Sequence, residues 1–483
     1  MPADFLLKIL AIINLLVSGS RSGTEVAFPL VLEKPWCSDS MRKRTLMQTG
    51  SVTSLLFLVR SAREFLGMTQ FAGPAPGRTA SPKDRFARPL SSARLFITIC
   101  IVLSLGGCSN DDLIPPFTIT FSVAVGDLNG DGRPDIASAN TFIAGPPPHP
   151  GHVSVILQSQ SSPGAFGSAM NLAVGSDPLM VSIGDLNGDN LMDLVAANES
   201  SASISILFQN SSSHGTFLTA QNLGVGAHPN GVAIGDLNGD GHLDIAVADS
   251  GLSILFQNAS DPGTFFSPLS LGVNCSSVGI GDLNVDGRAD LVAACANAGN
   301  VKLFLQNPAE AGTFLPPQTV AAGFQPKNVA IADLNADGLL DLAIANYGTG
   351  NSAGTASVSV LLNSSASPGS FSTATNYATG DNSWSVAVGD LNGDGKADLA
   401  VANAGTFSNI AGNVSVFFQN PGTPGAFLPA VNRPGASGPT GVAIADLNGD
   451  SLLDIALADE GVRILFQIPG QPGNFQSAIL VGS

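Results

Sequence analysis

Residues that usually build active sites and nucleic-acid surfaces are scarce in this chain. Its 483 residues include only 2 Tyr, 2 Trp and 5 His, and residues 109–483 carry 7 Lys+Arg against 31 Asp+Glu. A nucleic-acid surface needs clustered Lys and Arg, so the sequence disfavours nucleic acid as a partner. A lyase or hydrolase needs a cleft where Tyr, His, basic residues or carboxylate pairs are concentrated, so the composition favours binding over catalysis.

Cysteine and histidine patterns argue against redox and zinc chemistry. The five cysteines form no C-x-x-C pair, and no group of Cys and His has the spacing of a zinc site. The histidines show no metal or triad spacing either, so we expect them in exposed loops. They are His149, His152, His214, His228 and His242.

One acidic loop is present in seven copies. Each copy begins Asp-Leu-Asn and keeps carboxylates at loop positions 1, 5 and 9. The copies start at Asp127 (DLNGDGRPD), Asp185 (DLNGDNLMD), Asp236 (DLNGDGHLD), Asp282 (DLNVDGRAD), Asp333 (DLNADGLLD), Asp390 (DLNGDGKAD) and Asp446 (DLNGDSLLD). Oxygen side chains at positions 1, 3, 5 and 9, with Gly at position 6 in five copies, suit a hard cation that takes six or more oxygens. We therefore expect Ca²⁺.

The loops predict about seven structural Ca²⁺ ions, because all copies share one ligand set and an active site would single out one copy. The 21 aspartates at positions 1, 5 and 9 make up most of the 31 acids, so bound metal can offset the acidity without a basic partner. The expected ligands are Asp127, Asn129, Asp131, Asp135, Asp185, Asn187, Asp189, Asp193, Asp236, Asn238, Asp240, Asp244, Asp282, Asn284, Asp286, Asp290, Asp333, Asn335, Asp337, Asp341, Asp390, Asn392, Asp394, Asp398, Asp446, Asn448, Asp450 and Asp454.

The spacing of the loops predicts an all-β, seven-bladed propeller. They recur at intervals of 58, 51, 46, 51, 57 and 56 residues, which is typical of a repeat architecture. In the third unit, apolar runs at 231–235 and 244–248 flank the loop, and further strands are expected at 252–257 and 266–271. Four short antiparallel strands per unit form a propeller blade. A barrel or a sandwich is the weaker alternative, since neither explains seven equal units.

A G-x-F element predicts how the ring closes. It ends at Phe166, Phe217, Phe265, Phe314, Phe371, Phe427 and Phe475. No G-x-F precedes the first acidic loop, and no acidic loop follows the last G-x-F. Because the two ends complement each other, we expect the C-terminal strand, 475–481, to pair with the strand before Asp127 and close the propeller.

The DxNxDGxxD loop with G-x-F in register resembles the FG-GAP/VCBS repeats of the integrin α-subunit propeller and of bacterial surface proteins. The resemblance covers residues 117–483, and it implies structural calcium ions and no catalysis by the propeller. The loops depart from the pattern at position 6, where Asn190 and Ser451 replace Gly, and at position 4, where Val285 and Ala336 stand. Ser adopts positive φ less readily than Gly or Asn, so we expect the seventh loop to be the weakest site.

The N-terminal part predicts export and a lipid anchor. Arg94 precedes LFITICIVLSLGGC, an apolar run of signal-peptide length. Its end, Leu-Gly-Gly-Cys108, resembles the lipobox of bacterial lipoproteins, which implies a lipid on Cys108; Ser109 implies sorting to the outer membrane. We therefore expect a lipid-anchored protein of the bacterial cell envelope, held to the membrane by that anchor alone. A buried apolar strand with an incidental Cys is the alternative.

These signals divide the chain into four parts. Residues 1–93 form an extension of doubtful status, since a signal segment belongs at the N-terminus and translation starting at Met68 would remove most of the extension. The signal segment is 94–108, the linker 109–116 and the propeller 117–483. A second apolar run at 5–19 could be a competing signal. Because export permits oxidation, we also predict a disulfide between Cys275 and Cys295, at the far ends of the two strands flanking the fourth loop.

Unequal connections suggest a binding face. The connection from the second to the third strand is longer in units 1, 5 and 6 than in units 2, 3, 4 and 7, and it lies opposite the acidic loops. Insertions on one face of an array often bind a partner, although glycine-rich loops also vary in length without function. The candidate contacts are Phe142, His149, His152, Tyr347 and Phe407.

Two function classes follow. The first is a monomeric, non-catalytic adhesion module that binds a protein or glycan. The second is a carbohydrate-active protein, a lectin or a polysaccharide lyase, on the same fold.

Overall fold

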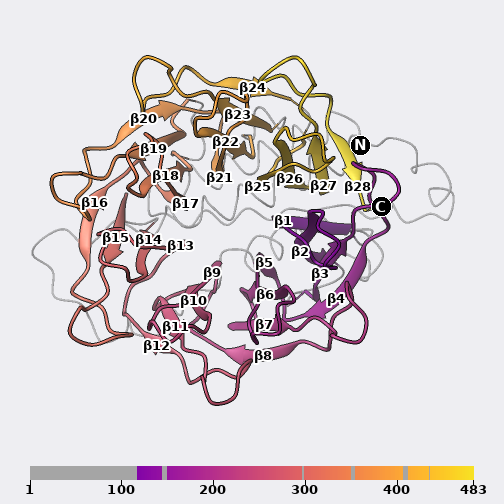
Figure 1. Ribbon diagram of the computed structural model, residues 1–483, viewed down its shortest axis with the longest axis vertical. Coiled ribbons are helices and arrows are strands. Elements are labelled where there is room, and N and C mark those ends of the chain that lie inside the picture. Colours follow the sequence, from indigo (N-terminus) through magenta and orange to yellow (C-terminus); the bar gives the residue numbers. More distant parts are fainter. Residues whose placement is uncertain are drawn as a thin grey trace, which may run out of the picture. The chain divides into compact units, whose positions relative to one another are not determined.

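The computed structural model describes residues 117–143, 149–295, 299–349, 354–405, 412–434 and 436–482. They form seven four-stranded antiparallel sheets arranged as blades around a ring, which confirms the all-β, seven-bladed propeller (Figure 1). The extension, the signal segment with Cys108, the linker and Phe407 lie outside the described residues. Within the described part of the chain, no helix is long and apolar enough to cross a membrane.

Each blade uses four consecutive strands, from the centre outward. The innermost strands are β1 (Phe117–Gly126), β5 (Pro178–Gly184), β9 (Gly231–Gly235), β13 (Ser277–Gly281), β17 (Pro326–Ala332), β21 (Ser383–Gly389) and β25 (Gly441–Ala445). The second strands are β2 (Asp135–Ile143), β6 (Asp193–Asn198), β10 (Asp244–Ala248), β14 (Asp290–Cys295), β18 (Asp341–Asn346), β22 (Asp398–Asn403) and β26 (Asp454–Asp459).

In the outer half of each blade, the third strand is largely buried and the fourth strand is short and largely exposed. The third strands are β3 (Gly151–Ile156), β7 (Ser203–Leu207), β11 (Ser253–Leu255), β15 (Asn300–Phe304), β19 (Ser357–Leu361), β23 (Asn413–Phe417) and β27 (Gly461–Leu465). The outermost strands are β4 (Met170–Val174), β8 (Gln221–Gly224), β12 (Leu269–Ser270), β16 (Gln318–Ala321), β20 (Thr375–Ala378), β24 (Val431–Arg433) and β28 (Ile479–Val481). Short outer strands limit the unpaired edge that each blade presents.

The hydrophobic core lies between blades. The second strands of blades 2 to 7 have a central run of apolar residues, and β6 is buried at every position because neighbouring blades cover both of its faces. One cluster, for example, packs Leu128 and Val153 of blade 1 against Val181 and Leu194 of blade 2. Complete burial of one such side chain contributes about 1.5–3 kcal/mol. Packing between blades therefore holds the acidic loops in a fixed arrangement.

The ring closes differently from the sequence-based expectation. The C-terminal strand β28 pairs with β27 of its own blade, and β1 pairs with β2, so the expected pairing of 475–481 with the first strand is wrong. Each G-x-F belongs to its own unit, since Gln467 bridges to Phe475 within blade 7. Blades 7 and 1 meet through side chains: Val123 packs in one cluster with Ile464.

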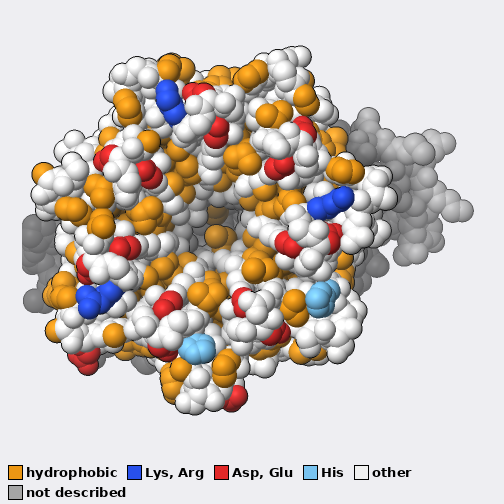
Figure 2. All heavy atoms as spheres, in the orientation of Figure 1, with side chains coloured by type: hydrophobic (Ala, Val, Ile, Leu, Met, Phe, Trp, Pro, Cys, Tyr) orange, Lys and Arg blue, Asp and Glu red, His pale blue; other side chains and the backbone are white. Residues whose placement is uncertain are grey.

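The antiparallel order separates two faces. The acidic loops and the turns between third and fourth strands lie at one end of the blades, and the connections between second and third strands lie at the other. Figure 2 shows acidic side chains spaced around the whole ring on the face that it presents. The long connections run over 144–150, 347–356 and 404–412, whereas β26 and β27 are joined through residue 460 alone.

Candidate metal centres

The side chains of each acidic loop fold the loop backbone around themselves. In the first loop, Asp127 Oδ1 accepts hydrogen bonds from the N–H groups of positions 4 and 5 at 2.7 and 3.1 Å, and Oδ2 accepts one from position 6 at 2.8 Å. Asn129 Oδ1 accepts from the N–H of position 5 at 2.9 Å, and Asp131 Oδ1 accepts from position 7 at 2.9 Å. The bond from position 6 to position 1 recurs in all seven loops at 2.8–2.9 Å.

Positive φ angles allow this turn. Position 6 is left-handed in every loop, including Asn190 at 64° and Ser451 at 67°, as the sequence predicted. Position 4 is left-handed as well, and there Val285 adopts 60° and Ala336 adopts 61°. A β-branched residue rarely adopts this conformation, so Val285 is the most strained position of the loops.

The aspartate at position 9 anchors the loop to its blade. Its Oδ2 accepts from the N–H of the Leu at position 2, at 2.8–3.0 Å in all loops. Its Oδ1 accepts from the N–H of a Gln or Asn that follows the third strand, at 2.7–2.8 Å. The side chain is buried in every blade.

Burial raises the pKa of every position 9 carboxyl above its ordinary value. The pKa rises to about 6 for Asp135, Asp244, Asp290 and Asp341, and to about 7 for Asp193, Asp398 and Asp454. The aspartates at positions 5 and 1 add to the rise, while the two backbone hydrogen bonds oppose it. A positive charge inside the loop would relieve this repulsion.

The loop chemistry fits a hard divalent cation. Asp131 Oδ2 is buried and has no hydrogen-bond partner, so one carboxylate oxygen of the first loop has its acceptor capacity unused. Three carboxylates and an amide oxygen are the donors that Ca²⁺ takes. Among the described residues, no three His, Cys, Asp or Glu side chains are gathered tightly enough to hold a metal ion. Amide groups of the protein occupy the carboxylates instead; in the fourth loop, Asn284 Nδ2 donates to Asp286 Oδ2 at 3.1 Å.

Comparison with known families agrees with this repeated geometry. A model of the FG-GAP-like repeat matches residues 185–247, 237–293, 282–344 and 335–401, and a model of the FG-GAP repeat matches residues 120–155. The chain belongs to the FG-GAP repeat family. No curated protein matches it in sequence.

Several solved structures resemble this FG-GAP propeller in fold alone. BBS1N in complex with ARL6DN is 12% identical with a TM-score of 0.46, over 74% of this chain and 94% of that chain. Rhamnogalacturonan lyase YesW is 11% identical with a TM-score of 0.42, over 72% of each chain. The periplasmic gluconolactonase PpgL of Pseudomonas aeruginosa is 15% identical with a TM-score of 0.48, over 76% of this chain and 97% of that chain. At these scores the likenesses carry no functional argument.

The Gln or Asn after the third strand was missed by sequence reasoning. It stands at a constant distance before each G-x-F Phe, and that spacing is the signal that could have revealed it. Besides its N–H bond to position 9, its side-chain amide donates to the carbonyl of position 8, as Gln209 Nε2 does to Met192 O at 2.9 Å. These residues are Gln158, Gln209, Gln257, Gln306, Asn363, Gln419 and Gln467.

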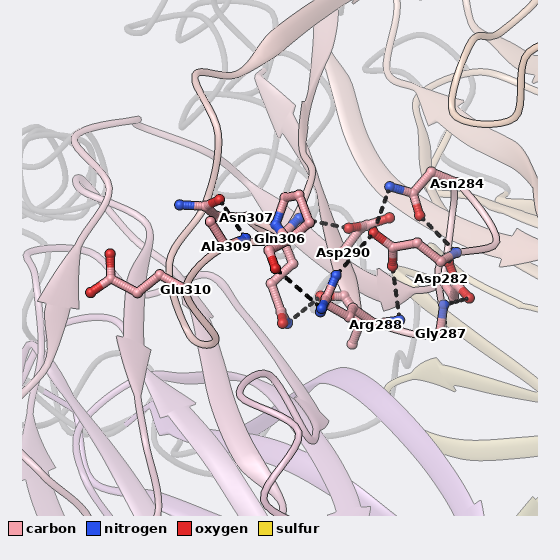
Figure 3. A network of polar contacts seen from close by, with 12 residues as sticks. Asp282, Asn284, Gly287, Arg288, Asp290, Gln306, Asn307, Ala309 and Glu310 are labelled. Carbon is pink, nitrogen blue, oxygen red and sulfur yellow. Dashed lines mark hydrogen bonds and ion pairs between the residues drawn. The ribbon is translucent and has the colours of Figure 1, made fainter.

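Blades 3 and 4 show how a turn of one FG-GAP blade covers the loop of the preceding blade. A cavity of about 330 Å³ lies there, lined by Asp236, Arg288 and Gln306 among others. Arg288 Nη2 donates to Pro308 O at 3.3 Å, and Nη1 lies 3.7 Å from Asp286 Oδ2 (Figure 3). The guanidinium group of Arg288 therefore joins the acidic loop of blade 4 to the turn that contains Pro308.

The predicted ligand contacts differ in exposure. Phe142 is 37% exposed, and His152 is half-buried, with burial lowering its pKa. His149 and Tyr347 are buried, which corrects the expectation for both. His149 Nδ1 lies 3.4 Å from Asp177 Oδ1, because His149, just before β3, lies against the segment that joins β4 to β5. Phe407 lies outside the described residues.

Tyr347 instead supports an aromatic and cationic cluster near the start of two inner strands. Its ring meets that of Trp384 edge-on at 5.6 Å, and Lys327 Nζ lies 5.3 Å from the Tyr347 ring and 4.8 Å from the Trp384 ring. Such contacts stabilise a cation by about 0.5–2 kcal/mol. Lys327 and Trp384 were not predicted as site residues, since no sequence spacing brings them together.

Cys275 and Cys295 are both buried; Cys295 is the last residue of β14, whereas Cys275 lies just before β13 and outside the strand that was expected to carry it. The structure records them as two free thiols, so the disulfide expected between them is not formed in it. Cys275 packs with Ala293 between blades 3 and 4, and Cys295 Sγ lies 3.7 Å from Ala293 O. Burial raises the pKa of both thiols.

Proposed function

We propose that this FG-GAP propeller is a calcium-stabilised, non-catalytic binding module, held in the bacterial cell envelope by a lipid on Cys108. One observation carries the non-catalytic role: all seven loops make the same hydrogen bonds at positions 1, 2, 6 and 9. Seven equivalent loops suit a structural ion in each blade, whereas catalysis needs one loop to differ from the rest.

The residues at positions 1, 3, 5 and 9 would hold the cation. Bound Ca²⁺ would supply positive charge that offsets the repulsion among the carboxylates. The chain's own contribution is to hold the loop backbone in place, through the N–H groups that bond to Asp127 and its equivalents. Binding free energy gained only by the folded state becomes stability.

The face with the long connections is the binding surface that we propose for a protein or glycan. Phe142 and His152 lie in the long region of blade 1, and Lys327 and Trp384 begin the inner strands of blades 5 and 6, so these blades bring aromatic, imidazole and ammonium groups to one face. Aromatic faces with nearby polar groups suit both ligand classes.

Calcium titration of the full-length chain tests the metal part. We expect isothermal titration of the chelator-treated protein to show about seven sites, and the melting temperature to rise with Ca²⁺. An unchanged melting temperature in Ca²⁺ and in EGTA would contradict the proposal. The loaded protein is then probed on glycan and protein arrays; a glycan that is cleaved during incubation would favour the carbohydrate-active alternative.

Metabolic labelling with a clickable fatty acid tests the anchor. The label should be incorporated in the wild type and lost in Cys108→Ala, which should also leave the membrane fraction. If Cys108→Ala stays in the membrane, the apolar run at 5–19 is the anchor instead. This outcome would leave the metal part of the proposal unaffected.

A further inference from the structure

Four of the seven Gln or Asn side chains described above reach the preceding blade. Gln306 Nε2 donates to Leu237 O at 2.8 Å, Asn363 Nδ2 donates to Leu283 O at 2.8 Å, and Gln419 Nε2 donates to Leu334 O at 2.7 Å. The fourth bond, from Gln158 Nε2 to Leu447 O at 2.9 Å, joins blade 1 to blade 7. Each acceptor is the Leu at position 2 of an acidic loop.

These bonds complete a chain between the position 9 carboxylates of neighbouring blades. Between blades 5 and 6, Leu334 N–H donates to Asp341 Oδ2 at 2.9 Å, and Leu334 O accepts from the side chain of Gln419. Gln419 N–H then donates to Asp398 Oδ1 at 2.7 Å. The backbone of one leucine and one glutamine therefore connect two predicted metal ligands.

The same chain links blades 3, 4, 5 and 6 in series, and separately blades 7 and 1. It is missing at three junctions of the described structure. Gln209, Gln257 and Gln467 keep their N–H bond to position 9 and their bond to the position 8 carbonyl, but they make no bond to the preceding loop. Gln467 Oε1 is buried without a partner. Among the described residues, blade 2 therefore lacks this Gln-to-Leu bond to either neighbour, although Ser122 and Ser182 form other hydrogen bonds at these two junctions.

We propose that Gln306, Asn363 and Gln419 are positioning residues that couple the metal loops of blades 3 to 6 into one cooperative group, with Gln158 coupling blades 7 and 1. This inference rests on the proposed binding of Ca²⁺. An ion that orients Asp341 fixes the backbone of Leu334 through its N–H, and the carbonyl of the same residue holds the side chain of Gln419. The backbone N–H of Gln419 in turn supports Asp398. Ordering one loop thus removes part of the ordering cost of the next loop.

The test compares a linked neighbour with an unlinked neighbour of the same loop. Asp390→Asn weakens the loop of blade 6 but keeps a side-chain oxygen for the loop amides. Ca²⁺ alone is titrated into the full-length chain. Amide hydrogen exchange by mass spectrometry gives, for each loop, the midpoint, which is the Ca²⁺ concentration at which half of the protection has developed. We expect the midpoint of the blade 5 loop to rise about fivefold or more, and that of the blade 7 loop to stay within about twofold. Equal shifts in both loops, or none in either, would overturn the coupling.

A matched pair of variants isolates the hydrogen bond itself. Gln419→Met removes the donor to Leu334, and Gln467→Met makes the same change at a residue that lacks the interblade bond. The Gln419 variant should separate the midpoints of the blade 5 and blade 6 loops, while the Gln467 variant should leave the midpoints of blades 6 and 7 as they were. Separation in both variants would assign the effect to the blade itself and contradict the proposal.

Failure of calcium binding gives a different result from failure of the coupling. If wild-type protein shows no Ca²⁺-dependent change, the proposed function fails. The exchange rates of the metal-free protein still test whether the interblade hydrogen bond couples the two loops. In that case Gln419→Met should speed exchange of the Leu334 amide, while Gln467→Met should leave the Leu391 amide unchanged. Equal exchange rates of the Leu334 amide in the wild type and the variant would show that the hydrogen bond does not stabilise the loop of blade 5, and would contradict the proposal.

Discussion

Gln158 Nε2 donates a hydrogen bond to the carbonyl oxygen of Leu447 at 2.9 Å, and this contact joins the first blade to the last. Thr440 Oγ1 adds a bond to Phe121 O at 3.0 Å across the same seam. The ring is therefore closed by side chains and apolar packing, without a shared strand. Among the described residues, no segment of chain runs directly from blade 7 to blade 1, so these contacts hold the two blades together.

Loss of the seam bond should destabilise the whole ring. Gln158→Met leaves the Leu447 carbonyl buried without this donor, and we expect the free energy of unfolding to fall by about 1–3 kcal/mol. Urea unfolding followed by fluorescence measures the change. Gln209→Met is the matched control, because Gln209 occupies the same position in blade 2 without an interblade bond. A control variant as unstable as the seam variant would show that the seam bond is not the cause.

Removal of one metal loop should lower both stoichiometry and stability. In Asp127→Ala or Asp390→Ala the amides of positions 4 to 6 lose their acceptor and the cation loses a ligand. We expect one Ca²⁺ fewer by titration, and a loss of about 2–3 kcal/mol relative to wild type at a calcium concentration 100 times the dissociation constant. In EGTA the difference between variant and wild type should shrink. An unchanged stoichiometry would show that the loop is not a site.

The metal-free protein should become more stable as the pH falls from about 7 toward 5. The pKa of each position 9 carboxyl is about 6 or 7 in the folded protein against an ordinary value of 3.8, so the folded state binds more protons than the unfolded state in this window. The free energy of unfolding therefore falls as the pH rises. The lowered pKa of His152 acts in the opposite direction, but one histidine stands against seven carboxyls.

Saturating Ca²⁺ should remove or reverse this slope, because the ion binds deprotonated carboxylates. Urea unfolding at pH 5, 6 and 7.5, in EGTA and in Ca²⁺, measures both slopes. Metal-free stability that rises steadily between pH 5 and 7.5 would contradict the raised pKa values.

Relief of backbone strain should stabilise two loops. Val285 and Ser451 adopt φ angles of 60° and 67°, which glycine adopts without steric cost. We expect Val285→Gly to raise the free energy of unfolding by about 1 kcal/mol, and Ser451→Gly by somewhat less. The reverse change, Gly188→Val, places the same strain in blade 2, where nothing else would crowd a Cβ, and should destabilise by a similar amount. Thermal unfolding in EGTA separates the strain from metal binding.

Local chemistry made much of this protein predictable. The turn of each loop depends on residues within nine positions of one another, so the aspartates, the strands that flank them and the positive φ of Ser451 follow from short-range sterics and hydrogen bonding. Position 4 differs from the repeat pattern in two loops, yet Val285 and Ala336 show that it adopts the same left-handed conformation there. The blade count followed from the repeat interval.

Tertiary structure alone decided what depends on contacts between blades. Gln158 and Leu447 are 289 positions apart in the sequence, and Gln419 and Leu334 are 85 positions apart. No local sequence pattern therefore predicts these hydrogen bonds. Burial of His149 and Tyr347 has the same origin, since neighbouring connections and rings cover them. The repeat sequence determined seven nearly equal blades and their acidic loops. Packing of each blade against the next determined how the ring closes and which loops are linked, because these hydrogen bonds join residues that only the assembled ring brings within reach of one another.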